Sequence, residues 1–85
     1  MRIQRSDAFK RDYGRLPNSA KLRVERQVGL LVTNRSHPSL RLKKMEVAGD
    51  IWEARVSEGH RMTLQFLEDI VFLRRVGTHD VLRHP

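Results

Sequence analysis

The chain has 85 residues, which suffice for one small domain with a single core, and we therefore treat residues 1–85 as one domain. The absence of cysteine excludes a disulfide framework and thiolate metal sites, and no run of about 18 apolar residues predicts a membrane-spanning helix. Lys and Arg number 17 against 10 Asp and Glu, a formal charge of +7 that indicates an anionic partner such as nucleic acid, a membrane surface or an acidic protein. An ordinary soluble surface with surplus Lys and Arg is the alternative interpretation. The start, M-R-I-Q-R-S-D, does not read as a signal peptide, so we expect a cytoplasmic protein.

The first half of the chain is predicted to contain an edge strand and a short helix. Residues 1–5 carry Ile3 in a polar run and are a candidate first strand. Ser6 is a favourable N-cap residue, and Asp7 suits the positive end of the helix dipole. Pro17 ends the helix because it cannot continue the hydrogen-bond ladder. The apolar stripe of this helix consists of Phe9, Tyr13 and Leu16.

A second helix is predicted after Asn18 or Ser19, either of which could cap it. Its apolar positions recur at helical spacing and should face the core. Basic residues lie off the stripes of both helices and form either a solvated face or a phosphate-contacting surface. The stripe of the second helix comprises Ala20, Val24, Val28 and Leu31, broadened by Leu22 and Leu30; the basic residues are Lys10, Arg11, Arg15, Lys21, Arg23 and Arg26.

The second half of the chain has the apolar–polar alternation of antiparallel strands. Residues 33–39 read as a loop, and residues 40–45 could start the sheet, with Leu40 and Leu42 inward. From residue 50 to residue 80, two turn signals separate three strands. The first is predicted to hold three residues, 58–60, because a two-residue turn would set Val56 opposite Arg61 and mix the two faces. The second is predicted to be Glu68–Asp69.

These elements predict an α+β domain in which two N-terminal helices pack on a curved antiparallel sheet of four to five strands. In the predicted register, Trp52 lies opposite Phe66, Ala54 opposite Leu64, and Val56 opposite Met62 on a core face. We expect one core that includes Trp52, Leu64, Phe66, Leu73, Val28 and Leu31, and an open face that carries Glu53, Arg55, Arg61 and Arg74.

Four short segments resemble the RelE/ParE toxin superfamily. They are residues 42–45 (L-K-K-M), 51–56 (I-W-E-A-R-V), 59–62 (G-H-R-M) and 75–79 (R-V-G-T-H). Their order is that of the family's L-K segment, aromatic-x-x-R-V strand, G-Y-R turn and closing G-T-H, most like the RelE, YoeB and YafQ mRNA interferases. The resemblance implies a RelE-like domain over the whole chain, acting as the toxin of a type II toxin–antitoxin system. Its expected partners are mRNA on the ribosome and a cognate antitoxin protein, in a heteromeric complex and without a membrane.

The resemblance also assigns roles to single residues. Arg61 stands at the arginine that contacts the scissile phosphate, and His79 at a catalytic histidine. Arg55 stands where relatives have a catalytic lysine or histidine, whereas Glu53 replaces another lysine, which departs from the pattern. The terminal aromatic residue of many members is missing, and Arg83 or His84 stands near its place. The predicted catalytic set is Arg61, His79, Arg55, Glu53 and His84, and the predicted RNA-binding set is Lys43, Lys44, Arg74, Arg75 and Arg83.

These residue types suit RNA cleavage by the RNA's own 2′-OH. The reaction requires that the 2′-OH lose its proton, that the phosphorane charge be stabilised and that the 5′-oxygen be protonated. An arginine fork suits the phosphorane, and a histidine suits either proton transfer. The reaction needs no metal, and the histidines at 37, 60, 79 and 84 lack ligand spacing, so no metal and no cofactor are expected.

Two other functions remain open at this point. A ParE-type toxin that inhibits gyrase would share the fold and act by protein binding. A basic nucleic-acid-binding module without catalysis would share the charge. The G-T-H ending, together with Arg55, Arg61 and His79, favours the nuclease over the gyrase inhibitor.

Overall fold

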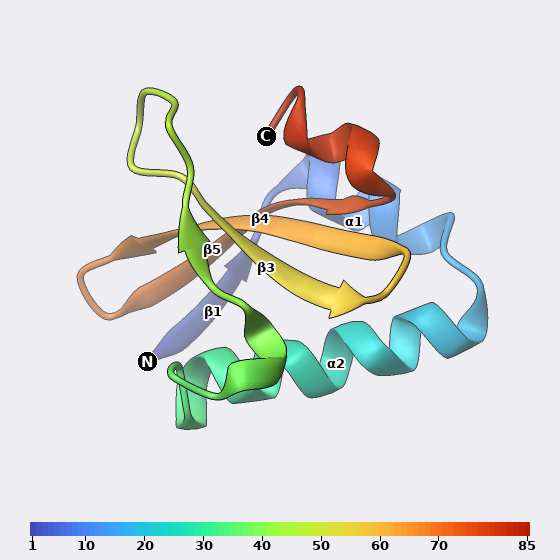
Figure 1. Cartoon of the computed structure of the whole chain (residues 1–85), viewed down its shortest axis with the longest axis horizontal. Helices are drawn as coiled ribbons and strands as arrows, with labels where there is room; N and C mark the ends of the chain where they lie inside the picture. The colour runs from blue at the N-terminus through green and yellow to red at the C-terminus, as the bar shows by residue number, and fades with distance from the viewer.

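Five strands form one sheet in the order β1-β5-β4-β3-β2, and two α-helices contribute to a core on one of its faces in the computed structural model (Figure 1). The structure describes all residues, 1–85. None of the helices is both long and apolar enough to cross a membrane. The elements are β1 (Arg2–Arg5), α1 (Asp7–Gly14), α2 (Asn18–Thr33), the 3-10 turn η1 (Pro38–Leu40), β2 (Lys43–Lys44), β3 (Trp52–Ser57), β4 (His60–Leu67), β5 (Ile70–Gly77) and the 3-10 turn η2 (His79–Leu82).

The predicted helices are present, with one correction to their caps. Ser6 caps α1, since its Oγ accepts a hydrogen bond from the Phe9 main-chain N–H at 3.0 Å. The N-cap of α2 is Pro17, which supplies no side-chain hydrogen bond, so the predicted capping by Asn18 or Ser19 is wrong. Pro17 fits this place because its ring already holds φ at −65°.

The stripe on α2 is confirmed except at one position. Ala20, Val24, Val28 and Leu31 are all buried. Leu22 is 73% exposed, contrary to its predicted place beside the stripe. At about 100° of rotation per residue, Leu22 lies on the opposite side of the helix from Ala20. Helical geometry, rather than hydrophobicity, therefore decides which leucines of α2 reach the core.

β1 is the one strand that runs parallel to its neighbour. It pairs with β5, from Arg2 opposite Ile70 to Arg5 opposite Leu73. The prediction of an all-antiparallel sheet is therefore wrong at this edge. Alternation along four residues identifies a strand, but it carries no information about the direction of the partner.

The turn between β3 and β4 differs from the predicted one. It holds two residues, Glu58 and Gly59, between the paired Ser57 and His60. A β-bulge at Val56 absorbs the extra residue, because Arg55 pairs with Arg61 while Ser57 pairs with His60. The predicted faces survive for this reason, although Trp52 lies opposite Leu64 and not opposite Phe66, and Ala54 lies opposite Met62.

The Glu68–Asp69 turn between β4 and β5 is confirmed. Leu67 pairs with Ile70 on either side of it, and Leu64 pairs with Leu73 as predicted. A second irregularity follows, since Thr63 pairs with Arg75 and leaves Arg74 as an extra residue on β5. A regular ladder continued from the Leu64–Leu73 pair would set Arg74 opposite Thr63, and the bulge shifts this position to Arg75.

The segment before the central hairpin is less regular than predicted. Leu40 is buried, as expected, but it belongs to η1 rather than to a strand. Arg41 follows in the left-handed region, at φ 43° and ψ 43°, and redirects the chain. Only Lys43 and Lys44 pair with β3, so β2 covers just the first part of that strand.

The core lies between the helices and the inward residues of β3, β4 and β5. Trp52 and Phe66 pack edge to face at 5.8 Å between ring centroids, but they are half-buried at the rim of this core, so their predicted place inside it is corrected. The Arg35 guanidinium, 3.8 Å from the Phe66 ring centroid, covers this rim. The fully packed residues include Phe9, Val24, Leu31, Leu40, Met62, Leu64 and Leu73.

Truncating a core leucine should destabilise the domain far more than truncating an exposed one. Leu64→Ala should lower the free energy of unfolding by about 2–5 kcal/mol, because it removes buried methyl groups and leaves a cavity. Leu22→Ala, the matched control on the exposed side of α2, should change it by less than about 0.5 kcal/mol. Urea unfolding followed by tryptophan fluorescence measures both, and equal midpoints would contradict the assigned core.

Candidate functional site

The face of the sheet turned away from α2 brings several predicted site residues together. Arg55 and Arg61 are direct partners across β3 and β4. Arg55 lies between the fully buried Ala54 and Val56, and Arg61 precedes the fully buried Met62, so both point to the open face. Glu53, two residues along β3, lies opposite Thr63 on the same face. The open face thus carries two neighbouring arginines on rigid strands.

Arg61 is held by the turn that precedes it. Its Nη1 donates hydrogen bonds to the carbonyl oxygens of Ser57 at 2.7 Å, His60 at 2.9 Å and Glu58 at 3.3 Å. These contacts use only one of the three guanidinium nitrogens. The side chain is therefore fixed in place while the donors on Nε and Nη2 stay available to a ligand.

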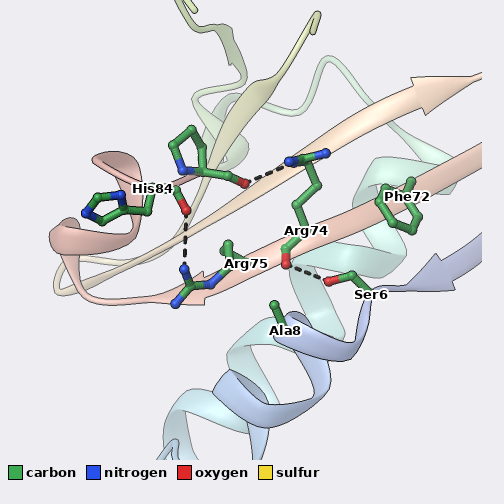
Figure 2. Close-up of a pocket in the computed structure, with 7 residues that line it drawn as sticks. Ser6, Ala8, Phe72, Arg74, Arg75 and His84 are labelled. Carbon is green, nitrogen blue, oxygen red and sulfur yellow. Dashed lines mark hydrogen bonds between the residues drawn. The ribbon is translucent and has the colours of Figure 1, made fainter. Parts of the chain in front are cut away.

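Arg74, the extra residue on β5, is bound by the C-terminal residues that cross the open face. Its Nε donates to the Pro85 carbonyl oxygen at 3.0 Å, and its Nη1 donates to Gln65 Oε1 at 2.9 Å. Thr63 Oγ1 donates to the same Pro85 oxygen at 3.0 Å, which explains why an open-face threonine is buried. Beside these contacts lies a pocket of about 320 Å³, lined by Ser6, Ala8, Phe72, Arg74, Arg75, His84 and Pro85 (Figure 2).

Arg75 makes the shortest ion pair of the molecule, with Asp12 of α1. Its Nε lies 2.6 Å from Asp12 Oδ2 and its Nη2 lies 3.2 Å from Oδ1, a two-pronged contact. The hydrogen bond to Asp12, and then the attraction of the charges, raises the pKa of Arg75 above its ordinary value, while partial burial lowers it. Because the pKa of Arg75 is higher in the folded chain than in the unfolded one, the ion pair stabilises the fold at every pH below the unfolded pKa. This stabilisation is lost only when the pH rises through the folded pKa, so Arg75 stays charged near neutrality. It can bind anions but does not release a proton near neutral pH.

His79 lies at the end of the sheet that carries Arg61. Gly77 pairs with Arg61 across β4 and β5, and His79 begins η2 two residues later with its side chain exposed. η2 rests against β4 and β5. The fit is close at Gly77, where an added Cβ would meet Val81 Cγ1 at 2.9 Å. The place of His79 therefore depends on the docking of η2.

The other C-terminal residues of the predicted site are less directed. The His84 carbonyl oxygen accepts a hydrogen bond from Arg75 Nη1 at 3.3 Å, while its imidazole ring turns away from the two arginines (Figure 2). Arg83 is exposed at the end of η2. His84 therefore lines the pocket together with Arg74 and Arg75, whereas Arg83 does not line it.

The two predicted lysines stand at the opposite edge of the sheet. Lys43 pairs with Glu53 along β2 and β3, and both line a shallow hollow there. Lys44 makes an exposed ion pair with Asp50 at 2.9 Å. Glu53 is thus shared between the lysine edge and the open face, and no ion pair joins it to Arg55 or Arg74.

Asp12, Thr63, Gln65 and Pro85 are contact residues that the sequence did not reveal. Each acts through a partner far along the chain, so spacing within one element gives no signal for it. One hint exists for Asp12, which is an isolated acid among basic residues of α1. His60, read as a turn residue, opens β4 and holds its Nδ1 3.2 Å from Ser57 Oγ. No group of three or more His, Asp or Glu side chains is placed to share a metal ion.

Solved structures with the same fold include toxins bound to their antitoxins. YafQ from E. coli strain BL21(DE3) superposes with a TM-score of 0.79 at 17% identity, covering 96% of this chain and 98% of that one. RelE in the RelB–RelE complex from Methanococcus jannaschii gives 0.71 at 17%, covering 95% of each chain. YoeB from Staphylococcus aureus, solved as a dimer, gives 0.74 at 13%, covering 93% and 97%. No protein-family model matches the sequence, and neither does any curated protein.

The likeness extends over nearly the whole of both chains, so it concerns the complete architecture rather than one motif. Two N-terminal helices on an open, mostly antiparallel five-stranded sheet are the arrangement of the RelE-like toxins. The chain therefore has the RelE-like toxin fold, as its sequence motifs predict, with YafQ, YoeB and RelE among its structural neighbours.

The Asp12–Arg75 contact should be more important for stability than the exposed ion pairs. Asp12→Asn should lower the free energy of unfolding by about 1–3 kcal/mol, because it weakens charge-assisted bonds to Arg75 and to the Val76 N–H. Glu25→Gln removes the exposed pair with Arg5 and should cost less than about 1 kcal/mol. Chemical denaturation at neutral pH compares the two, and a larger loss from Glu25→Gln would disprove the assignment.

Proposed function

We propose that this protein is the toxin of a type II toxin–antitoxin pair and acts as an endoribonuclease on mRNA at the ribosome. The observation that carries the proposal is the setting of Arg61, which is anchored by one nitrogen and open at the others, opposite Arg55 and at the end of the sheet where η2 begins. The RelE-like fold supports it. The cytoplasm is the proposed compartment, because mRNA and ribosomes are there.

In the proposed reaction, the 2′-OH of the RNA attacks the neighbouring phosphorus and the 5′-oxygen leaves. Negative charge builds up on the non-bridging oxygens as the phosphorane forms. Arg61 would donate to these oxygens from Nε and Nη2, which need no reorganisation because Nη1 is already bound to the turn. Arg55 would add a second positive charge from the adjacent strand.

Proton transfer is assigned to His79, which is exposed, because an imidazole can act as either a general acid or a general base. It would remove the 2′-OH proton or protonate the leaving 5′-oxygen. Arginine cannot replace it, since guanidinium groups keep their protons at neutral pH. Glu53 and His84 are secondary candidates for the same task, and Glu53 is the better placed of the two because it shares the open face with Arg55. No step requires a metal ion or another cofactor.

The remaining basic residues would bind the RNA backbone on either side. Lys43 and Lys44 are exposed at the β2 edge, and Arg83 is exposed beyond η2. Arg74 would contact RNA through Nη2, since its Nε and Nη1 are bound within the chain. All three nitrogens of Arg75 already donate to Asp12 or to the His84 carbonyl oxygen, so Arg75 would contribute mainly its charge. Phosphate contacts of this kind position the substrate without reading its sequence.

Single-turnover cleavage of mRNA on ribosomes tests the assignments. Arg61→Ala should slow cleavage by a few hundred-fold, about 3–4 kcal/mol, because it removes a donor to the phosphorane. Arg61→Lys should recover only part of this rate, since a point charge cannot reproduce the fork. His79→Ala should lose about 10²–10⁴-fold and the corresponding limb of the pH–rate profile, with ribosome binding nearly unchanged.

The matched control is Arg2→Ala, which removes an exposed arginine from β1 at the far edge of the sheet and should cleave normally. Full activity of the double variant Arg61→Ala/His79→Ala would show that the site is wrong. A wild type that binds RNA without cutting it would favour a non-catalytic binding module, and DNA strand breakage with gyrase would favour the ParE-type function.

The proposed function implies an antitoxin partner. Two of the structural neighbours, YafQ with DinJ from E. coli and RelE with RelB from M. jannaschii, were solved as toxin–antitoxin complexes. The chain carries a formal charge of +7 and has an exposed edge strand, β1. Both features suit the binding of an acidic and partly disordered segment that folds on binding.

Co-expression with the protein encoded by the adjacent gene should abolish toxicity. The purified complex should melt about 10 °C or more above the free chain, because a partner at about a hundred times its Kd adds about 2.7 kcal/mol. Calorimetry measures the shift, with an unrelated acidic protein of equal charge as the control. A chain that is harmless when expressed alone, and whose melting is unaffected by the neighbour, would refute the toxin assignment.

A further inference from the structure

A second cluster of arginines lies at the outer edge of β3, where β2 no longer covers it. β2 pairs only with Glu53 and Trp52, so the later part of β3 is bounded by α2 and η1 instead. A hollow of about 380 Å³ opens there. Its lining residues are Arg23, Pro38, Ser39, Arg41 and Arg55.

The walls of this hollow are fixed by a buried glutamine of α2. Gln27 is 1% exposed, and its Nε2 donates to the Arg55 carbonyl oxygen at 3.0 Å and to the Ser39 carbonyl oxygen at 3.3 Å. The opposite orientation of the amide would place its oxygen against these two carbonyl oxygens, so the assignment is determined. Arg23 Nε also donates to the neighbouring Val56 carbonyl oxygen at 3.3 Å. α2, η1 and β3 are therefore tied together directly beneath the hollow.

The hollow is strongly and uniformly positive. No carboxylate lines it, and none of its three arginines takes part in the three ion pairs of the molecule. Arg41 also occupies the left-handed backbone region at φ 43°, which an arginine rarely adopts. Three uncompensated guanidinium groups around one depression leave a site that an anion would neutralise.

We propose that this hollow binds an internucleotide phosphate of single-stranded RNA. Arg23 on α2, Arg41 after η1 and Arg55 on β3 would offer forked donors from three segments of the chain. A phosphate has oxygens directed to several sides and accepts such a spread of donors, whereas one carboxylate is satisfied by a single arginine fork. An acidic protein segment would also need apolar anchors, and Pro38 is the only such surface in the hollow.

The position of the hollow connects it to the proposed cleavage site. Arg55 contributes to it and also lies opposite Arg61, on strands that are about 4.8 Å apart. RNA whose scissile phosphate meets Arg61 could therefore place a neighbouring phosphate in the hollow. This deepens the proposed function, on which it rests for the identity of the polyanion. It gives Arg55 a second role, that of positioning the RNA, beside the charge that it would add at the scissile phosphate.

The test uses a short 2′-O-methyl oligoribonucleotide without terminal phosphates, which cannot be cleaved through its 2′ position. Arg41→Gly is the leading variant, because glycine suits the positive φ and should leave the melting temperature unchanged or higher. Its affinity for the RNA, measured by fluorescence anisotropy, should fall about tenfold. The slope of log K against log salt should shrink by about one, as for the loss of one phosphate contact.

Arg2→Ala is the matched control, equal in charge change but located on β1 at the other edge of the sheet, and its affinity should change less than about twofold. Unchanged affinity and slope in Arg41→Gly would overturn the proposal, as would an equal loss in the control. Weaker binding of polyglutamate with unchanged RNA binding would also overturn it, in favour of an acidic protein partner. Because the RNA cannot be cleaved, the result stands whether or not the wild type is a nuclease.

Discussion

The alternation of β4 is the constraint on which the rest of the structure depends. β4 is the central strand, and its inward residues Met62 and Leu64 are fully buried while Arg61 between the turn and the core points outward. Each flanking strand carries one residue too many for this alternation, and each places the extra residue in a bulge, at Val56 on β3 and at Arg74 on β5. Without the bulges, a slip of one residue would carry the arginines into the core and the valines out of it.

α1 completes the sheet where β1 ends. β1 pairs with β5 only as far as Leu73, and beyond that point the edge of β5 is bound by α1. The Ser6 hydroxyl donates to the Arg74 carbonyl oxygen at 2.7 Å, and Asp12 accepts from the Val76 N–H at 3.2 Å. Ser6 thus caps its helix and joins it to the strand, which explains how a helix of eight residues is positioned. The positions of Arg74 and Arg75 therefore depend on these contacts between α1 and β5.

The sequence predicted those features that depend on neighbours along the chain. Helical spacing located Val24, Val28 and Leu31, turn chemistry located Glu68–Asp69, and strand alternation placed Arg55 and Arg61 on one face. The sequence did not predict the features that depend on contacts between residues far apart in the chain. The direction of β1, the partner of Arg75 and the C-terminal carbonyl groups over Arg74 all depend on segments that meet only after folding. A regular ladder is incompatible with a two-residue turn at Glu58–Gly59, and the bulge that makes this turn possible leaves no mark in the sequence pattern.

Because Val81 approaches Gly77 closely, the position of His79 depends on the size of residue 77. The space at residue 77 admits a hydrogen atom and little more, since a Cβ would stand 2.9 Å from Val81 Cγ1. Val81 is buried, so η2 lies on the sheet through this contact and cannot easily yield. A methyl group at residue 77 would push η2 away from the sheet and displace its first residue, His79, from the end of β4. The geometry of the candidate site would then be altered by an atom that lies outside it.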